Sequence, residues 1–323
     1  AYPIETTAQM TVNYLVPKGA SANAFANFCG ADMVVVDVGV AADLSHVPGL
    51  MARKIAYGTR DFTEGPAMTR EQAIKAIEVG IEIVNTKAQA GFTCFSLGEM
   101  GIGNTTASAA IVAAFTGESA ECVTGRGTGI SDSRLQKKIG IVRKALALNK
   151  PDPTDGLDVL AKVGGFELGT LAGVIIGCAA NRCAAVIDGL NTTAAALVAY
   201  AICPLVRDYI FPSHLSGEPA HIIALRHLQL TACVNMGVRL GEAIGASVVV
   251  DMLSAAVPLL NREVMAAKAK GLTLRSTEAG PKSISLAEAI NAIKPLSQEA
   301  MDRCQLRLDN LTKPLNSLHA FEH

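Results

Sequence analysis

The sequence predicts an α/β protein with a Rossmann-like, doubly wound and mainly parallel sheet. Short apolar or β-branched runs alternate along the chain with segments of helical periodicity, as expected for strands joined by crossover helices. The polar side chains Asp37, Glu99, Asp188 and His214 each follow or end one of these runs. Ligands of open α/β sheets bind at the carboxyl ends of the strands, so we expect the functional site there.

The first two predicted strands enclose a helix. Residues 33–38 form a β-branched run of the kind found in buried parallel strands. Thr69 and Gln72 have capping-box spacing, and apolar residues recur at helical spacing over 74–88. The apolar run 92–97 follows. This β-α-β order predicts a right-handed crossover between two strands of one parallel sheet.

Two more strands are predicted at 185–187 and 208–211. The remaining helical patterns lie at 107–115, 133–149, 167–180, 192–201 and 219–228. Residues 266–282 have the composition of a linker, and two amphipathic helices are predicted after it, at 286–293 and 298–311. We therefore expect an α/β domain over residues 25–262 and a small helical domain built from 1–24 and 263–323.

Composition excludes several classes of protein. The chain has 323 residues, 50% of them hydrophobic, enough for a large core in one or two domains. The net charge of −1 gives no electrostatic footprint for nucleic acid or an anionic membrane, and no apolar run approaches the roughly 20 residues of a membrane span. The eight cysteines and six histidines show no metal-ligand spacing. We expect a soluble cytoplasmic protein without a metal site.

Residues 98–106 form the most informative motif. A strand that ends in a glycine-rich turn and opens into a helix presents unpaired backbone N–H groups to an anion. Gly101 and Gly103 allow close approach of the backbone, and Asn104 and Thr105 add short polar groups and a natural N-cap. A turn made only for phosphate would not contain Glu99, so the motif indicates a site that also handles positive charge or a proton. A tight strand-to-helix turn without a ligand explains the same residues.

Two further glycine loops have the same two interpretations. Gly125 and Gly127 can form an anion-binding nest or a flexible loop. Gly164 and Gly165 precede a predicted helix and can form a phosphate cradle or a helix–helix turn. Lys138, on the helix after the second loop, is either a phosphate ligand or an ordinary solvated lysine.

Glu242 is the remaining candidate. It lies between glycine and apolar residues, a weakly polar setting that suits a general base, although an exposed glutamate at a helix end gives the same pattern.

Several motifs together resemble one family, the nicotinate-nucleotide:dimethylbenzimidazole phosphoribosyltransferases of cobalamin synthesis. The motifs lie at 98–106, 155–168, 187–189, 212–216 and 239–242. The similarity runs in order from about residue 1 to about residue 265, and the glycine-rich motifs are specific in combination. Segments 285–296 and 311–318 resemble the family's amino-terminal segment, so the order of the chain is permuted relative to the family. The Ala-Asp-His-Gly motif that the family carries between these parts does not occur in the sequence.

The resemblance implies a reaction and a set of site residues. The reaction transfers 5-phosphoribosyl from nicotinate mononucleotide to 5,6-dimethylbenzimidazole or a related aromatic base, giving α-ribazole 5′-phosphate and nicotinate, with no cofactor. Glu242 corresponds to the catalytic base, and Glu99 is expected to stabilise positive charge on the ribose. The other implied substrate-binding residues are Gly101, Gly103, Asn104, Thr105, Gly125, Gly127, Lys138, Gly164, Gly165, Asp188, Ser213, Tyr2 and Met10. The resemblance also implies a homodimer, or a dimer with a close homologue.

Tyr2 and Met10 depart from one common form of the family, which has a small polar residue and a glutamine there. The wall that binds the base is then larger and less polar, so phenol or cresol is an alternative acceptor. Two other hypotheses stay open at this point. The β-α-β pattern with a glycine-rich turn also fits an NAD-binding oxidoreductase, and the permuted order fits an inactive subunit that supports an active partner.

Overall fold

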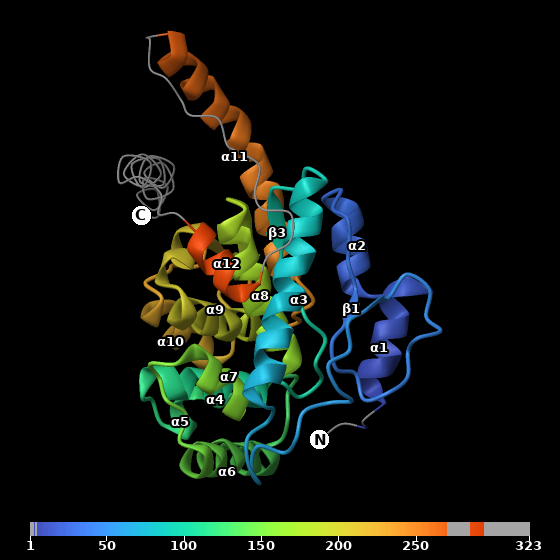
Figure 1. The fold of residues 1–323 in the computed structure, drawn as a ribbon, viewed down its shortest axis with the longest axis vertical. Coiled ribbons are helices and arrows are strands. Elements are labelled where there is room, and N and C mark those ends of the chain that lie inside the picture. The colour runs from blue at the N-terminus through green and yellow to red at the C-terminus, as the bar shows by residue number, and fades with distance from the viewer. Residues whose placement is uncertain (1–2, 4, 270–284, 294–323) are drawn as a thin grey trace, which may run out of the picture. The chain divides into compact units, whose positions relative to one another are not determined.

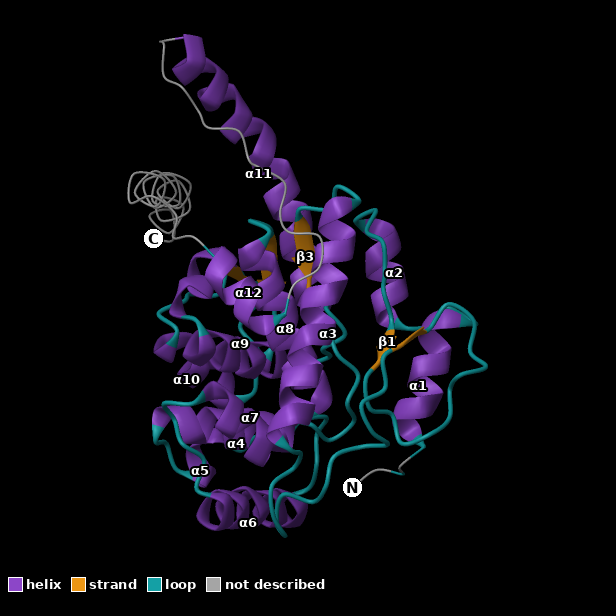
Figure 2. Cartoon of the chain, in the orientation of Figure 1, coloured by secondary structure: helices purple, strands orange, loops and turns teal. Residues whose placement is uncertain are grey.

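The computed structural model describes residues 3, 5–269 and 285–293 of the chain. Tyr2 and the helix predicted at 298–311 lie outside these residues. The described part is an α/β structure in which helices predominate over two small parallel sheets (Figure 2). The α/β class is therefore confirmed.

The larger sheet has three parallel strands in the order β3-β4-β5. Their bounds are Cys94–Ser96 for β3, Ala184–Ile187 for β4 and Ile210–Pro212 for β5. Cys94 pairs with Ala184, and Ala185 pairs with Ile210. The strand order advances in one direction only, so the described sheet lacks the reversal that defines a doubly wound fold. The predicted double winding is not confirmed.

The prediction that residues 33–38 and 92–97 share a sheet is wrong. Strand β1 (Val36–Asp37) pairs instead with β2 (Met51–Ala52) in a separate parallel sheet. The Asp37 carboxylate stabilises the turn that follows β1. It accepts the backbone N–H groups of Gly39 and Val40 and pairs with Lys54 at 2.7 Å. The buried Asp37 is therefore part of an ion pair with the partly exposed Lys54. The strand predicted at 208–211 also begins late, because Pro204–Tyr209 form a 3₁₀ helix, η1.

The helices agree with the sequence pattern at most positions. Their bounds are α1 Thr6–Leu15, α2 Ser21–Phe28, α3 Arg70–Gln89, α4 Thr105–Thr116, α5 Ala120–Val123, α6 Asp132–Asn149, α7 Gly156–Val163, α8 Phe166–Ala180, α9 Leu190–Ile202, α10 Pro219–His227, α11 Ile244–Ala269 and α12 Leu286–Ala292 (Figure 1). The capping box of α3 is confirmed, since the Thr69 side chain accepts the Gln72 N–H and the Gln72 side chain accepts the Thr69 N–H.

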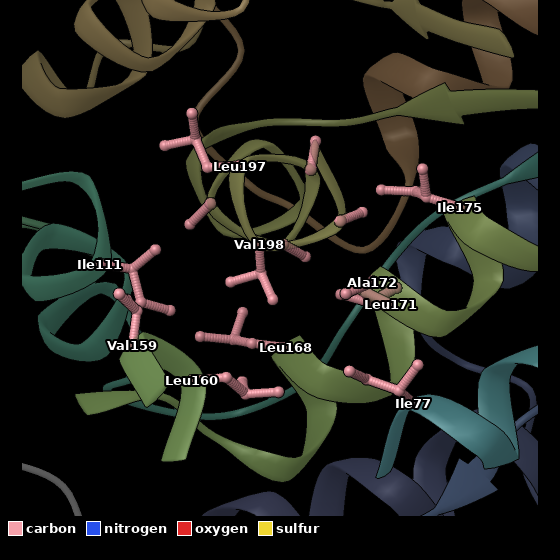
Figure 3. Close-up of a cluster of buried hydrophobic side chains, with 14 of the residues drawn as sticks. Ile77, Ile111, Val159, Leu160, Leu168, Leu171, Ala172, Ile175, Leu197 and Val198 are labelled. Atoms are coloured by element: carbon pink, nitrogen blue, oxygen red, sulfur yellow. The ribbon is translucent and has the colours of Figure 1, made fainter. Parts of the chain in front are cut away.

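Helix α8 lies at the centre of the core and is buried on nearly all its faces (Figure 3). It packs along α3 through glycines on both helices. A β-carbon at Gly173 would lie 1.9 Å from the Ile77 carbonyl oxygen, and one at Gly80 would lie 2.1 Å from the Thr170 carbonyl oxygen. Only glycine permits backbones this close. The crossing therefore fixes the start of α8, which bears Glu167.

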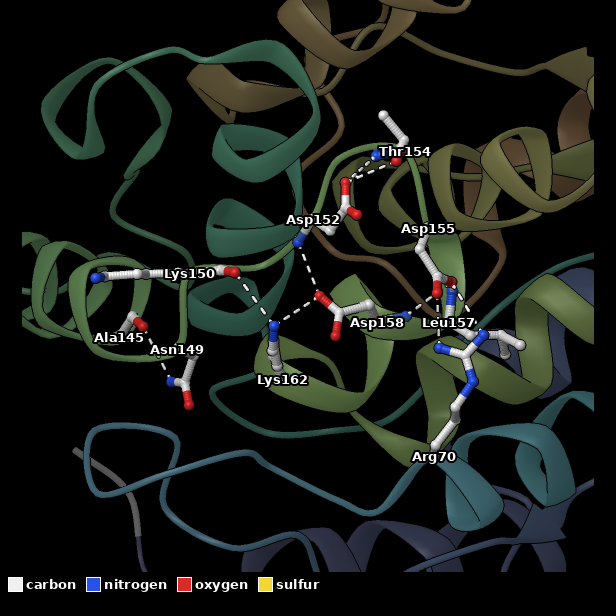
Figure 4. A network of polar contacts seen from close by, with 10 residues as sticks. All are labelled: Arg70, Ala145, Asn149, Lys150, Asp152, Thr154, Asp155, Leu157, Asp158 and Lys162. Carbon is white, nitrogen blue, oxygen red and sulfur yellow. Dashed lines mark hydrogen bonds and ion pairs between the residues drawn. The ribbon is translucent and has the colours of Figure 1, made fainter.

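A polar network on the surface anchors the start of α7 (Figure 4). The Asp155 carboxylate accepts the N–H groups of the residues at 157 and 158, as an N-cap does, and binds Arg70 of α3 at 2.7 Å. Lys162 binds Asp158 at 2.8 Å one turn later. The Arg70–Asp155 pair joins α3 to α7, the helix that leads into the predicted glycine pair at 164–165.

The chain after residue 244 departs from the expected linker. Helix α11 continues through residue 269, so the first four residues of the segment 266–282 are helical, and the helix runs across the predicted boundary at 262. Helix α12 packs against α3 and α8 and buries Leu286 and Ala289. The division into a domain of residues 25–262 and a helical domain from the two chain ends stays a prediction.

Candidate active site

The turn between β3 and α4 is the centre of the candidate site. Asn104 occupies the N-cap position of α4, but its side chain does not cap the helix. The amide instead donates to two carboxylates, with Nδ2 2.5 Å from Glu99 Oε2 and 3.2 Å from Glu167 Oε1. The predicted side-chain N-cap is therefore wrong, because Asn104 Oδ1, the atom that would cap the helix, instead accepts the Asn191 amide at 2.8 Å.

Glu99 is held by three N–H donors. Gly101 N–H lies 2.8 Å from Oε2, and the side chain of Asn191, from the start of α9, lies 2.6 Å from Oε1; Asn104 supplies the third donor. Asn191 is itself oriented by Ser108 Oγ at 2.7 Å. Both carboxylate oxygens are thus fixed by groups from the β3–α4 turn and α9.

Glu167 faces this carboxylate from α8. Its carboxyl folds back over Gly165, where a β-carbon would lie 2.6 Å from either oxygen. Burial and then the negative charge of Glu99 raise the pKa of Glu167 to about 7. The backbone of Gly164 and Gly165 is brought to the site as predicted, but the first turn of α8 already has a carboxylate beside it. Whether these glycines bind a phosphate stays a prediction.

A buried cation lies next to the turn. Lys138 Nζ donates to Thr105 Oγ1 at 2.7 Å and to the Gly125 carbonyl oxygen at 3.1 Å. Burial lowers its pKa, and the Glu218 carboxylate opposes this shift. Glu218 in turn accepts the Gly127 N–H at 2.9 Å, which holds the glycine loop 125–127 against the lysine. The structure thus brings these sequence-predicted residues together.

The other basic side chains of this region point elsewhere. Lys137 is exposed. Arg126 forms an ion pair with Asp132 and donates to the Ile130 carbonyl oxygen, on the exposed side of the loop. Lys138 is therefore the buried cation of this loop and helix.

Glu242 approaches the same centre from the turn before α11. Gly241, Glu242 and Ala243 all have left-handed backbone angles, with φ of 83°, 58° and 62°. A β-carbon at Gly241 would lie 3.8 Å from Glu99 Oε1, and one at Gly98 would contact Ala243 at 2.7 Å. Two non-glycine residues in this conformation are strained, and such strain is commonly found at functional sites.

Helices α1 and α2 hold the Glu242 side chain. Its Oε2 accepts the Ala22 N–H at 3.3 Å, in the first turn of α2. The Tyr14 hydroxyl of α1 hydrogen-bonds the same carboxylate, and burial followed by the Glu242 charge raises the pKa of Tyr14 far above its usual range. Met10 lies one turn before Tyr14 on α1 and is partly buried. Tyr2 is outside the described residues.

The start of α11 is anchored at the ends of β4 and β5. Asp188 Oδ1 accepts the Ala246 N–H at 3.0 Å and lies 3.6 Å from His214 Nδ1. Burial raises the pKa of Asp188 to about 6. The buried Ser213 hydroxyl lies 3.2 Å from His214 Nδ1 and 3.4 Å from the Asp188 carbonyl oxygen. Asp188 and Ser213 thus hold the turn that carries Glu242, and a direct role of either in binding a substrate stays a prediction.

Sequence reasoning missed four side chains that shape this site. They are Tyr14, Glu167, Asn191 and Glu218. Glu167 belongs to the motif at 155–168 and Asn191 follows the motif at 187–189, so proximity to these motifs was the available signal. Among the described residues no cluster of three metal-ligating side chains occurs, and no described helix has the length and hydropathy needed to cross a membrane.

Comparison with known proteins identifies the chain as a phosphoribosyltransferase. The family model described as phosphoribosyltransferase matches residues 1–270. A nicotinate-nucleotide–dimethylbenzimidazole phosphoribosyltransferase of Dehalococcoides mccartyi strain BAV1 is 51% identical over 255 residues, which cover 79% of this chain and 72% of the relative. The corresponding protein of Geobacter metallireducens is 47% identical over 269 residues, covering 83% and 76%. The chain belongs to the nicotinate-nucleotide–dimethylbenzimidazole phosphoribosyltransferase family.

A solved structure supports the same conclusion. The crystal structure of CobT from Thermus thermophilus matches with a TM-score of 0.77 and 41% identity, over 81% of this chain and 78% of that one. The resemblance seen in the sequence is thereby confirmed. The oxidoreductase and the inactive-subunit hypotheses gain no support from these relatives.

Proposed function

We propose that this protein transfers the 5-phosphoribosyl group of nicotinate mononucleotide to 5,6-dimethylbenzimidazole, giving α-ribazole 5′-phosphate and nicotinate. One observation carries the proposal: the buried cation Lys138 and the carboxylates Glu99 and Glu242 are linked in that spatial order through neighbouring residues of one site. Thr105 contacts Lys138, the adjacent Asn104 contacts Glu99, and the residue before Glu242 faces Glu99. The names of the relatives supply the two substrates.

The phosphate of the donor is bound at the Lys138 end. A buried ammonium group next to a hydroxyl, a glycine loop and the first turn of α4 matches a phosphate, which needs positive charge and several N–H or O–H donors. Gly101, Gly103, Gly125 and Gly127 let the backbone approach it. The ribose then extends toward Glu99.

Glu99 stabilises the charge that develops on the sugar. The bond between the anomeric carbon and the pyridinium nitrogen breaks, and its electron pair returns to the nitrogen, so nicotinate leaves as a neutral ring. The anomeric carbon carries positive charge in this transition state. A carboxylate fixed beforehand by three N–H donors stabilises that charge without having to reorganise.

Glu242 acts as the general base toward the acceptor. Its carboxylate takes the ring N–H proton of the benzimidazole while the other ring nitrogen attacks the anomeric carbon. Attack from the face opposite to the departing nicotinate inverts that carbon and gives the α linkage. The Ala22 N–H and the Tyr14 hydroxyl orient the carboxylate for this role.

Helix α1 supplies the wall that faces the acceptor. Thr7 Oγ1 accepts the Ile102 N–H at 3.4 Å, and Tyr14 reaches Glu242, so one face of α1 lies along the site. Met10 lies on the same side, between these two residues in the sequence. Its flexible apolar side chain favours the apolar methylated ring of dimethylbenzimidazole.

The proposal is tested by incubating the purified protein with nicotinate mononucleotide and a panel of benzimidazoles, purines, phenol and cresol. Mass spectrometry then identifies the riboside phosphate, and chromatography measures nicotinate. We expect the N-linked riboside phosphate of dimethylbenzimidazole as the main product. A protein that binds the nucleotide but forms no product with any acceptor would contradict the proposal.

The base assignment has its own test. Replacement Glu242→Gln keeps the shape of the side chain but cannot accept the proton, so we expect loss of transfer, by about 100-fold or more, with nicotinate mononucleotide still bound. Glu64→Gln, at an exposed carboxylate in the loop before α3, is the matched control. Near-normal turnover in Glu242→Gln would show that another group takes the proton.

A further inference from the structure

Two carboxyl groups share one amide at the centre of the site. Asn104 Nδ2 carries two hydrogens and donates to Glu99 and Glu167, while its Oδ1 accepts from Asn191 at 2.8 Å. Every polar atom of this amide is therefore used within the network. The amide cannot turn to relieve one carboxyl without losing the other, so the two groups are held close to each other.

The two members of this pair have unequal surroundings. Glu99 has two N–H donors that it does not share, from Gly101 and Asn191, and N–H donors stabilise negative charge. Glu167 has the shared amide and its own backbone N–H. None of the ion pairs among the described residues includes Glu99 or Glu167. A proton in this pair therefore belongs on Glu167.

The other charged groups around the pair are accounted for. Glu99 is the charge that acts on Glu167, and Glu99 also acts on Asp188 at the end of β4 and on Tyr14 of α1. The cation Lys138 lies beyond Thr105, where Glu218 accompanies it. The centre of the site thus has a surplus of negative groups and no cation of its own among the described residues.

We propose that Glu167 carries this proton in the free protein and releases it to solvent when a cationic pyridinium nucleotide binds beside Glu99. This inference rests on the proposed function. The pyridinium of nicotinate mononucleotide brings a positive charge to the pair, and a nearby positive charge favours the ionised form of a carboxyl. The O–H bond of Glu167 breaks, the proton passes to buffer, and the pair then faces the anomeric carbon with two negative charges.

The proposal makes the number of protons released measurable. With the pKa of Glu167 at about 7, about half of the free molecules carry the proton at pH 7. Complete ionisation on binding then releases about 0.5 proton per site at pH 7, about 0.9 at pH 6 and about 0.1 at pH 8. A change in the ionisation of the nucleotide's own phosphate also contributes to the number of protons released, and this contribution is the same for every variant of Glu167.

Calorimetry of nicotinate mononucleotide binding, without acceptor, measures the release at each pH when it is run in two phosphate-free buffers of different ionisation enthalpy, PIPES and ACES. We expect Glu167→Gln to lose this pH-dependent release and to keep only the contribution of the nucleotide, since its amide keeps the shape and carries no titratable proton. Glu167→Asp keeps a carboxyl and is expected to retain the release. Glu64→Gln, remote and exposed, is the control that leaves it unchanged.

The outcomes are distinct. A release that follows the expected pH course and disappears in Glu167→Gln supports the proposal. The proposal is overturned if the wild-type binding heats do not differ between the two buffers, or if the release persists in Glu167→Gln. The wild-type measurement shows whether protons are released at all, even where a variant does not fold. Failure of the proposed function looks different, because the wild type then forms no riboside phosphate and releases no nicotinate with any acceptor, even where it binds the nucleotide.

Discussion

Gly245 is the residue whose replacement best tests how the fold positions Glu242. A β-carbon at this position would lie 1.9 Å from His214 Nδ1 and 2.7 Å from two ring carbons. The histidine cannot easily retreat, because it is buried and lies between the Asp188 carboxylate and the Ser213 hydroxyl. In Gly245→Ala the first turn of α11 must therefore move.

The size of the movement follows from the contact distance. Ordinary contact with a β-carbon begins at 3.4 Å, so the 1.9 Å approach must open by 3.4 − 1.9 = 1.5 Å. Glu242 precedes Gly245 by three residues, and its left-handed backbone ties it to the same turn. A misplacement of about 1 Å at a catalytic group can lower a rate by about 100-fold, and overpacking of a core typically destabilises by about 1–3 kcal/mol. We expect effects of this size on the transfer rate and on the free energy of unfolding.

The assay measures kcat for nicotinate release, the affinity for nicotinate mononucleotide and the thermal midpoint. Gly140→Ala on α6 is the matched control, because no atom lies within 4 Å of the position of its β-carbon. Replacing a helical glycine by alanine there is expected to stabilise by about 0.5–1 kcal/mol without changing kcat. If Gly245→Ala kept kcat within twofold of the wild type, the Asp188–His214 anchor would not be what positions Glu242.

Three further predictions concern single side chains of the site. Lys138→Met removes the buried charge, so KM for nicotinate mononucleotide is expected to rise by about 10- to 100-fold, and an unchanged KM would contradict the phosphate assignment. Tyr14→Phe removes the hydroxyl that orients the Glu242 carboxylate, so we expect a several-fold lower kcat with little change in KM for nicotinate mononucleotide. Tyr200→Phe on α9 should leave both unchanged. Met10→Gln makes the wall facing the acceptor more polar. We expect the rate of transfer to unsubstituted benzimidazole to rise relative to the rates with phenol and cresol, and unchanged relative rates would show that Met10 does not influence the choice of acceptor.

The local parts of this architecture could be predicted from the sequence. The helical periodicity after Thr69, the helix over 133–149 and the turn at 98–106 depend on residues close together in the chain, and all three are found. The partner of strand β1 could not be predicted, because a short β-branched run has the same pattern in either sheet.

The site shows the same limit. The glycine turn and Lys138 were identifiable, since each belongs to a motif with its own spacing. The Tyr14–Glu242 contact joins positions 228 residues apart in the sequence, and no spacing rule connects them. The contact between Glu99 and Asn191 is equally unconnected by any spacing rule, and it depends on the register of β3 against β4. Side chains of this kind become visible only when the tertiary structure brings their elements together.

The density of carboxyl groups explains why these remote contacts are needed. Glu99, Glu167, Asp188 and Glu242 converge on one region, and ionisation of all four without compensation would be strongly unfavourable, because like charges at short range oppose each other. The fold gives each group different partners: N–H donors for Glu99, the Ala22 N–H and a phenol for Glu242, and burial that raises the pKa of Glu167 and Asp188 toward neutrality. Environments that separate the protonation states of neighbouring carboxyls are what assign acid, base and charge-stabilising roles in an active site. The fold therefore gives neighbouring carboxyl groups different environments, which is what the proposed division of roles between Glu99 and Glu242 requires.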